Sequence, residues 1–230
     1  MAQAERKKRK QQAETRRRLP VFIGIGAVVV IAGVIAIGAS GGGDDEPIGT
    51  TTTVEGGTAP GEYQQVVVEG DVLPTLGDTG TDAALGLDAP SLKGYTFTGA
   101  PIAVDPGSDG TPTMLVFLAH WCPHCNREVP RLLEWLDEGN APTNLRIIGV
   151  ATSSKSDQAN WPPSKWLEDF EWPWEVLTDS EASTAAATYG VDGFPFMVIM
   201  DADGKVVRRH SGEIEVADLT TLVNTALGIE

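Results

Sequence analysis

Cysteine, histidine and positive charge are all scarce in this sequence. Its 230 residues include two cysteines and three histidines. That is too few for a scaffold held together by several disulfides. Residues 1–18 hold eight of the 17 Lys and Arg but two of the 32 Asp and Glu, so the other 212 residues carry a net charge of −21. Such an acidic chain is not expected to bind nucleic acid, because phosphates are bound by clustered Lys and Arg.

Long uncharged runs are scarce too, but one lies near the N-terminus. Residues 19–39 carry no charge, and as a helix they would span about 30 Å, the thickness of the hydrocarbon core of a membrane. The basic residues of segment 1–18 precede this run. Because positive charge favours the cytoplasmic side, we expect 1–18 in the cytoplasm and everything after Ser40 outside it.

A cleaved signal peptide is the alternative interpretation of residues 19–39. Its apolar region would usually be shorter, about 7 to 15 residues, although Ala39 is a small residue that would suit cleavage. The run has no cysteine near its end, which excludes lipoprotein anchoring. The sequence therefore favours an uncleaved signal anchor, and a single-pass protein of the cell membrane.

Residues 40–82 are expected to form a flexible extracytoplasmic tether. Their first part is rich in Gly, Thr and Pro, and such a segment buries too little apolar surface to offset the entropy lost on ordering. Three consecutive valines, Val66–Val68, are followed by Val72 and Leu73. These residues either form a short strand or lie as an extended apolar patch on the domain, and the sequence alone leaves both open.

From about residue 83 the chain has the pattern of an α/β domain. Short apolar runs predict strands buried on both faces, and apolar residues at helical spacing predict helices. Asp203–Gly204 is typical of a hairpin turn, and Gly190 of a helix C-terminus. The predicted strands are 114–119, 145–151, 196–200 and 205–209, and the predicted helices are 123–137, 164–170, 181–189 and 216–227. This order predicts an α/β sandwich with a mixed sheet.

Both cysteines lie in one motif, Cys122-Pro123-His124-Cys125, directly after a predicted buried strand and at the start of a predicted helix. The free N–H groups and the dipole of a helix N-terminus favour an anion. They therefore favour the thiolate of Cys122, which is the nucleophilic form of a thiol. Proline suits the first helical position, where its missing N–H would have had no partner. The motif indicates a redox-active cysteine pair.

Three other interpretations of the pair are weaker. A structural disulfide closing so short a loop would stabilise the fold little. A zinc site needs about four ligands, and beyond the cysteines the chain offers only His120, His124 and His210, with no second paired motif. An inert buried pair does not suit the polar histidines that flank it.

The segment Ala119–Cys125 (AHWCPHC) resembles the active-site segment of the thioredoxin superfamily. Gly190–Pro195 and the strand and hairpin after it resemble that family's cis-proline loop and following hairpin. The resemblance covers residues 83–230 and implies a thioredoxin-like sandwich, a mixed central sheet flanked by helices. Cys125–Pro130 (CNREVP) is similar to the Cys-x-x-Glu-x-Pro continuation of the membrane-anchored, extracytoplasmic TlpA-like branch.

The resemblance also implies roles for individual residues. Cys122 and Cys125 would form the redox-active disulfide of a protein-disulfide oxidoreductase that needs no bound cofactor and no metal. The residues implied as substrate contacts are Trp121, Phe194 and Pro195, with Pro195 as the cis residue. Exported proteins with cysteines would be the substrates, and a transmembrane redox partner would recycle the pair.

Glu128 and His124 are candidate tuning residues. Glu128 lies one turn after Cys125 on the same helix face, where a carboxylate could relay protons and raise the pKa of the thiols. The alternative for Glu128 is a solvated helix residue. It could also replace the buried acidic residue of cytoplasmic thioredoxins, whose place is taken here by Val116.

The direction of the reaction is not settled by the sequence. The TlpA-like resemblance slightly favours reduction. The Pro-His pair instead resembles strongly oxidising disulfide-forming enzymes, because the partial positive charge of His124 stabilises the Cys122 thiolate and makes the disulfide easier to reduce.

Other functions on this fold remain as alternatives. A peroxide-reducing enzyme would be expected to have a lone cysteine in a Pro- and Thr-rich loop. A copper-binding assembly factor would favour Cys-x-x-x-Cys and a distal histidine on a loop, whereas the one candidate, His210, lies in a predicted strand. A non-catalytic adaptor would not need an intact cysteine pair. Four further tryptophans, Trp161, Trp166, Trp172 and Trp174, either line a substrate groove or pack in the core.

Overall fold

The computed structural model of the chain describes residues 57–77 and 80–229. The expected cytoplasmic segment 1–18, the expected membrane span 19–39 and the first part of the expected tether lie outside the described residues. Within the described ranges, no helix has both the length and the apolar character needed to cross a membrane.

Eight strands form one mixed sheet in the described part of the chain. The strands are β1 (Val67–Glu69), β2 (Ser91–Tyr95), β3 (Pro101–Val104), β4 (Thr113–Leu118), β5 (Arg146–Ala151), β6 (Glu175–Thr178), β7 (Phe196–Met200) and β8 (Val206–Ser211). Their order is β1-β2-β6-β5-β4-β7-β8, and β3 pairs with β2. The central strand β4 runs parallel to β5 and antiparallel to β7, which confirms the expected mixed sheet.

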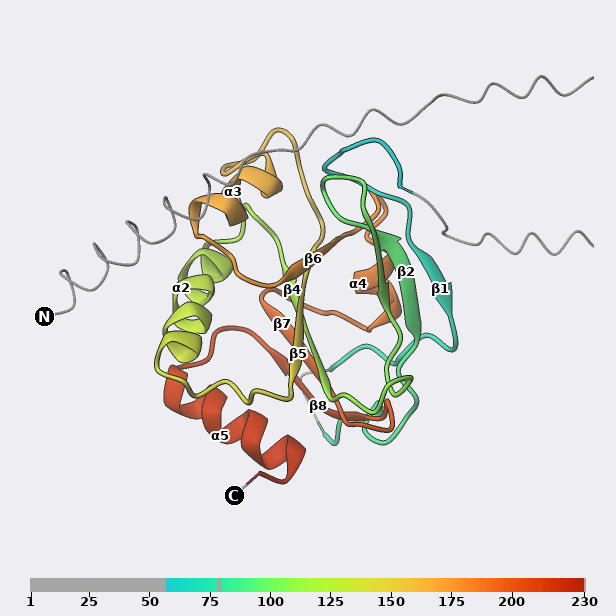
Figure 1. Cartoon of the computed structure of the whole chain (residues 1–230), viewed down its shortest axis with the longest axis vertical. Coiled ribbons are helices and arrows are strands. Elements are labelled where there is room, and N and C mark those ends of the chain that lie inside the picture. Colours follow the sequence, from blue (N-terminus) through green and yellow to red (C-terminus); the bar gives the residue numbers. More distant parts are fainter. Residues whose placement is uncertain (1–56, 78–79, 230) are drawn as a thin grey trace, which may run out of the picture. The chain divides into compact units, whose positions relative to one another are not determined.

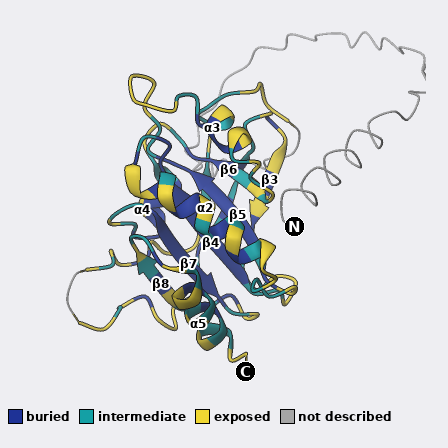
Figure 2. Ribbon diagram, turned by 90° about the vertical axis from the view of Figure 1, so that its left-hand side faces the viewer, coloured by how far each residue is buried: buried dark blue, intermediate teal, exposed yellow. Residues whose placement is uncertain are grey.

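The helices lie on both sides of this sheet. They are α2 (Pro123–Asp137), α3 (Pro163–Asp169), α4 (Thr184–Thr188) and α5 (Val216–Leu227). Helices α2 and α5 cover one face of the sheet, and α4 lies on the other (Figure 1). Each face therefore has its own apolar core, which explains why every residue of β4 and β7 is buried (Figure 2).

The helix predicted at 181–189 is shorter in the structure. Ser183 has a left-handed backbone conformation with φ 57°, and α4 begins at the next residue. The buried carboxylate of Asp179 accepts hydrogen bonds from the N–H groups of Ala185 (2.8 Å) and Ala186 (3.2 Å). Asp179 thus satisfies free N–H groups in the first turn, the role of a helix cap, although it lies outside the helix. Gly190 follows the helix with φ 66°, the conformation expected at a helix C-terminus.

The domain begins earlier than the expected boundary at residue 83. Strand β1 pairs antiparallel with β2, with Val67 opposite Lys93. The side chain of Leu73 is buried, and its N–H donates to Thr188 O at 2.9 Å, whereas Val72 is 67% exposed. The structure thereby corrects the prediction that all of 40–82 is a tether. Leu73 belongs to one apolar core, and Val66, Val68 and Leu76 pack against it.

A buried arginine on β8 fixes the same segment. The guanidinium of Arg209 donates to Pro74 O at 2.8 Å and forms an ion pair with Asp82, to which its Nε donates at 3.0 Å. The hydrogen bond from Arg209 is the main cause that lowers the pKa of the Asp82 carboxyl below its ordinary value. Buried charges are tolerated when they are paired in this way. Residues on both sides of 78–79 are therefore held against the sheet.

Candidate active site

The cysteine motif lies where a buried strand leads into a helix. Strand β4 ends at Leu118, Cys122 has an extended backbone conformation just before α2, and Pro123 is the first helical residue. The N–H of Cys122 donates to Ala119 O at 3.0 Å, which closes the connecting turn. This placement confirms the predicted one: the Cys122 sulfur lies at the N-terminus of a helix of 15 residues.

The second predicted segment lies beside the first. The Phe194–Pro195 peptide bond is cis, as the resemblance implies. The Cys122 thiol lies 3.5 Å from Phe194 O, and the rings of Trp121 and Phe194 meet edge to face at 6.4 Å. Residues 72 positions apart in the sequence thus surround one sulfur.

The two cysteines have unequal surroundings. Both are free thiols in the structure. Cys122 is 6% exposed and Cys125 is fully buried. Burial raises the pKa of the Cys125 thiol well above its ordinary value, although the N–H of Ala119, 3.5 Å from its sulfur, opposes this. Cys122 is therefore the outer thiol, and Cys125 the inner one, which stays protonated unless a base assists it.

Glu128 is fully buried, so it is not a solvated helix residue. Its Oε2 accepts the N–H of Ile214 at 3.1 Å and lies 3.5 Å from Arg131 Nη1, whereas its Oε1 has no hydrogen-bond partner among the described residues. Burial raises the pKa of the Glu128 carboxyl to about 7. Its charge also acts on the Cys125 thiol. A carboxyl with this pKa can accept or release a proton near neutral pH.

His124 contacts Glu213, a residue that the sequence analysis missed. Glu213, on the loop between β8 and α5, has its Oε1 2.5 Å from His124 Nδ1 and 2.6 Å from Arg127 Nη2. Its Oε2 lies 2.6 Å from Arg131 Nη1. The hydrogen bonds from Arg127 and then His124 lower the pKa of the Glu213 carboxyl to about 2. No motif marks Glu213, which lies 89 residues from His124 in the sequence.

The other two histidines are held by hydrogen bonds. His120 is buried, and its Nε2 accepts the N–H of Lys155 at 3.1 Å. Its Nδ1 therefore carries the proton and donates to Ala159 O at 2.7 Å. Burial lowers the pKa of His120, so the ring is neutral. His210 lies on β8, which extends two residues beyond the predicted strand 205–209, and its Nε2 is 3.4 Å from Glu213 O. Among the described residues, no three His, Cys, Asp or Glu side chains group as metal ligands.

Most of the tryptophans serve packing. Trp166 is buried, and the rings of Trp172 and Trp174 meet at 4.8 Å. A Cβ atom at Gly149 would lie 3.1 Å from Trp172, so the glycine leaves room for that ring. Trp166 thus belongs to the core, and Trp172 and Trp174 are partly buried against it. Trp161 instead lies beside Tyr63 and His120, at 5.9 and 5.7 Å between ring centroids.

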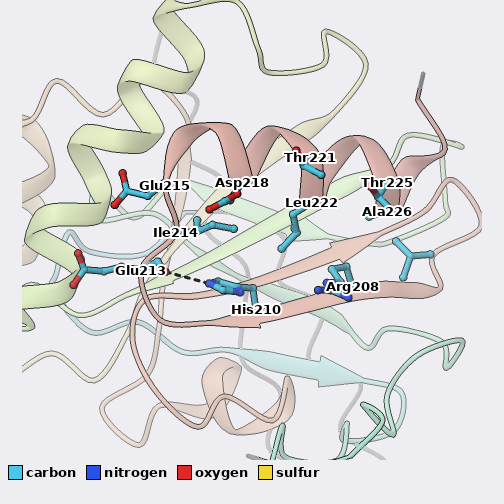
Figure 3. Close-up of a pocket in the computed structure, with 11 residues that line it drawn as sticks. Arg208, His210, Glu213, Ile214, Glu215, Asp218, Thr221, Leu222, Thr225 and Ala226 are labelled. Carbon is cyan, nitrogen blue, oxygen red and sulfur yellow. Dashed lines mark hydrogen bonds between the residues drawn. The ribbon is translucent and has the colours of Figure 1, made fainter.

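A groove of about 650 Å³ lies between β8 and α5 (Figure 3). Its charged lining comes from Arg208, His210, Glu213, Glu215 and Asp218, and the apolar part of its lining includes Leu222 and Ala226. Neither cysteine lines it. The groove is therefore separate from the thiols, and Glu213 is the residue that it shares with the surroundings of His124.

Comparison with known proteins identifies a family and several relatives of the chain. The model of the AhpC/TSA family matches residues 85–209, more than half of the chain. The thiol:disulfide interchange proteins DsbE of Pasteurella multocida and Haemophilus influenzae are 31% and 32% identical to it over 105 residues. Each alignment covers 46% of this chain and 53% of the relative, so the chain spans about half the length of the curated relatives it matches.

A solved structure shares the fold. The crystal structure of a DsbE candidate from Chlorobium tepidum superposes with a TM-score of 0.52 at 23% identity, covering 63% of this chain and 98% of that one. At this identity the likeness concerns the fold, which is the thioredoxin-like sandwich.

Proposed function

The chain belongs to the AhpC/TSA family of thioredoxin-like proteins, and on that basis we propose that it is a thiol–disulfide oxidoreductase acting on exported proteins through Cys122 and Cys125. The observation that carries the proposal is the position of the Cys122 sulfur, at a helix N-terminus and 3.5 Å from the carbonyl of Phe194. A nucleophile and a backbone edge able to bind an extended substrate strand thus lie side by side. The names of the DsbE relatives support the same chemistry.

The first half of the reaction takes place at Cys122. Its thiolate, favoured by the N–H groups at the start of α2, attacks one sulfur of a substrate disulfide. A sulfur–sulfur bond forms between protein and substrate, and the other substrate sulfur leaves as a thiolate. Trp121 and the backbone of Phe194 and Pro195 would hold the substrate chain against the sulfur during this step.

The second half takes place at Cys125. Its thiol gives up its proton to the carboxylate of Glu128, and its sulfur attacks Cys122. The Cys122–Cys125 disulfide forms as the mixed disulfide breaks, and the substrate leaves with both sulfurs reduced. Two electrons have then passed from the cysteine pair to the substrate. Run in reverse, the same steps oxidise a substrate dithiol.

We favour reduction as the working direction. The support is the sequence Cys125–Pro130, which resembles the TlpA-like reductases. A reductase outside the cytoplasm needs an electron source, and a transmembrane redox partner would supply it. Residues 19–39 would anchor the chain beside that partner, with 1–18 in the cytoplasm and the domain outside. Neither a nucleic acid nor a bound cofactor has a part in this function.

Single-cysteine labelling in intact cells tests the location. Val72→Cys, at a site 67% exposed, is introduced into full-length protein in which Cys122 and Cys125 are serine. A membrane-impermeant maleimide should label this variant in intact cells, because the domain lies outside. The matched variant, Gln3→Cys in the same background, should be labelled only after lysis. Labelling of Val72→Cys only after lysis would contradict the proposed location.

The thiol state of the unchanged chain tests the direction. Acid quenching of the same cells, followed by alkylation, counts the free thiols of the pair. A reductase that is kept supplied with electrons should be found mainly with both thiols free. A chain found mainly as the disulfide would contradict reduction and support oxidation of exported dithiols.

A further inference from the structure

Glu213 joins three basic side chains of α2 in one place. Its two carboxylate oxygens lie within 2.6 Å of nitrogens of His124, Arg127 and Arg131. In Figure 3 the carboxylates of Glu213 and Glu215 point away from His210 and toward α2. Glu215 also contacts this group, but only through Arg131, at 2.7 Å.

The loop that carries Glu213 also contacts the other side of the active site. The N–H of Gly212 donates to Pro195 O at 2.8 Å. The loop therefore links the start of α2 with the segment Phe194–Pro195, and Glu213 is held in place from the backbone as well as through its side chain.

The basic side chains that Glu213 binds lie within and just after the cysteine motif. His124 lies between the two cysteines in the sequence. The pKa of the Arg127 guanidinium is raised, mainly by its hydrogen bonds to Glu213 and in smaller part by the charge of Cys122. Arg127 Nη2 also lies 3.0 Å from His124 Nδ1, so the guanidinium lies against the residue that separates the two cysteines.

We propose that Glu213 is a positioning residue that lowers the reduction potential of the Cys122–Cys125 pair by neutralising Arg127 and binding His124. The inference rests on the proposed function and deepens it. Reduction of the disulfide creates a thiolate at Cys122, and nearby positive charge stabilises that thiolate and makes the disulfide more oxidising. A carboxylate bound to the same side chains cancels part of their positive charge. Glu213 would thereby keep the reduction potential of this Cys-Pro-His-Cys motif low, so that the pair reduces its substrates.

The test is a redox titration of the full-length protein in detergent against glutathione. At equilibrium the protein disulfide and two glutathione molecules exchange with the dithiol and one glutathione disulfide, so two electrons are transferred. Glu213→Gln keeps the shape of the side chain and removes its charge. We expect the equilibrium constant for reduction of the protein to rise about fivefold, a potential about 20 mV more positive. The shift should shrink as salt is added, because these side chains are partly exposed.

Two further variants separate charge from structure. Glu215→Gln is the matched control, since Glu215 contacts neither His124 nor Arg127, and it should leave the potential unchanged. Arg127→Gln alone should shift the reduction potential to more negative values. In the double variant with Glu213→Gln, the potential should return toward that of the unchanged protein. If Glu213→Gln does not fold, the single Arg127→Gln variant still tests the proposal.

Equal potentials for the Glu213→Gln variant and the unchanged protein would overturn this inference and leave the proposed function intact. An equal shift of the potential in Glu215→Gln would also overturn it, because the shift would then come from Arg131 and not from His124 or Arg127. For Arg127→Gln, an unchanged potential would also overturn it. A failure of the unchanged protein to show any reversible couple would instead overturn the proposed function itself.

Discussion

Replacing Cys122 by serine should abolish disulfide exchange, and replacing Cys125 by serine should trap the chain on its substrate. A hydroxyl is not a nucleophile for a disulfide at neutral pH, so Cys122→Ser should lower the rate of disulfide reduction by at least about 10³-fold. The Cys125→Ser variant keeps the outer thiol and can complete only the first half of the reaction. A mixed disulfide should therefore accumulate, which non-reducing electrophoresis and intact-mass measurement will detect.

The two single variants should behave differently, and this difference shows which cysteine attacks the substrate. Cys125 has no exposed surface, and burial raises the pKa of its thiol, so it should not attack a substrate directly. The double variant, with serine at both positions, is the control and should give no covalent complex. Efficient formation of a mixed disulfide by Cys122→Ser would contradict the assignment of Cys122 as the attacking residue.

Replacing Glu128 by glutamine should slow resolution of the mixed disulfide by about 10²-fold above neutral pH. Only the ionised carboxylate can accept the proton of Cys125, and the Glu128 pKa is about 7. In the unchanged protein the rate of resolution should therefore rise with pH through this value. In the glutamine variant that rise should be absent. Rapid-mixing measurements of substrate release across pH give both profiles.

Two controls separate proton transfer from a loss of folding. Glu134→Gln changes an exposed carboxyl on the same helix and should leave the pH profile unaltered. Because burial raises the pKa of Glu128 above its ordinary value, the stability that this group provides is present below that ordinary value and lost as pH rises through about 7. The Glu128→Gln variant should therefore unfold at a higher temperature than the unchanged protein in mildly alkaline solution. An unchanged pH profile in this variant would rule out Glu128 as the proton acceptor.

The parts of the fold that could be predicted are those with an unbroken local signal. Strands β4, β5 and β7 lie between two layers of side chains, so their sequences are continuous apolar runs. Helices α2 and α5 carry regular apolar faces and were predicted with the bounds that the structure gives them. The cysteine motif and the Phe194–Pro195 segment were recognisable because their residues are adjacent in the sequence.

The features that could not be predicted depend on contacts with residues far away in the sequence. The sequence analysis missed strands β2, β3 and β6, because each mixes buried residues with half-buried or exposed ones over four or five positions. β2, for example, contains Lys93 and Gly94. Glu213 could not be identified either. Its role arises only when the loop after β8 reaches the first turns of α2, and no spacing in the sequence records that contact.

The most direct test of this account is whether the unchanged full-length protein has one reversible two-electron couple on its cysteine pair. Protein equilibrated in a series of glutathione mixtures is quenched in acid and alkylated, and the added groups are counted by mass. We predict two alkylated thiols at the reducing end and none at the oxidising end. A single reversible transition should lie nearer the thioredoxin value of about −270 mV than about −120 mV. Two free thiols at every potential would contradict the proposed function.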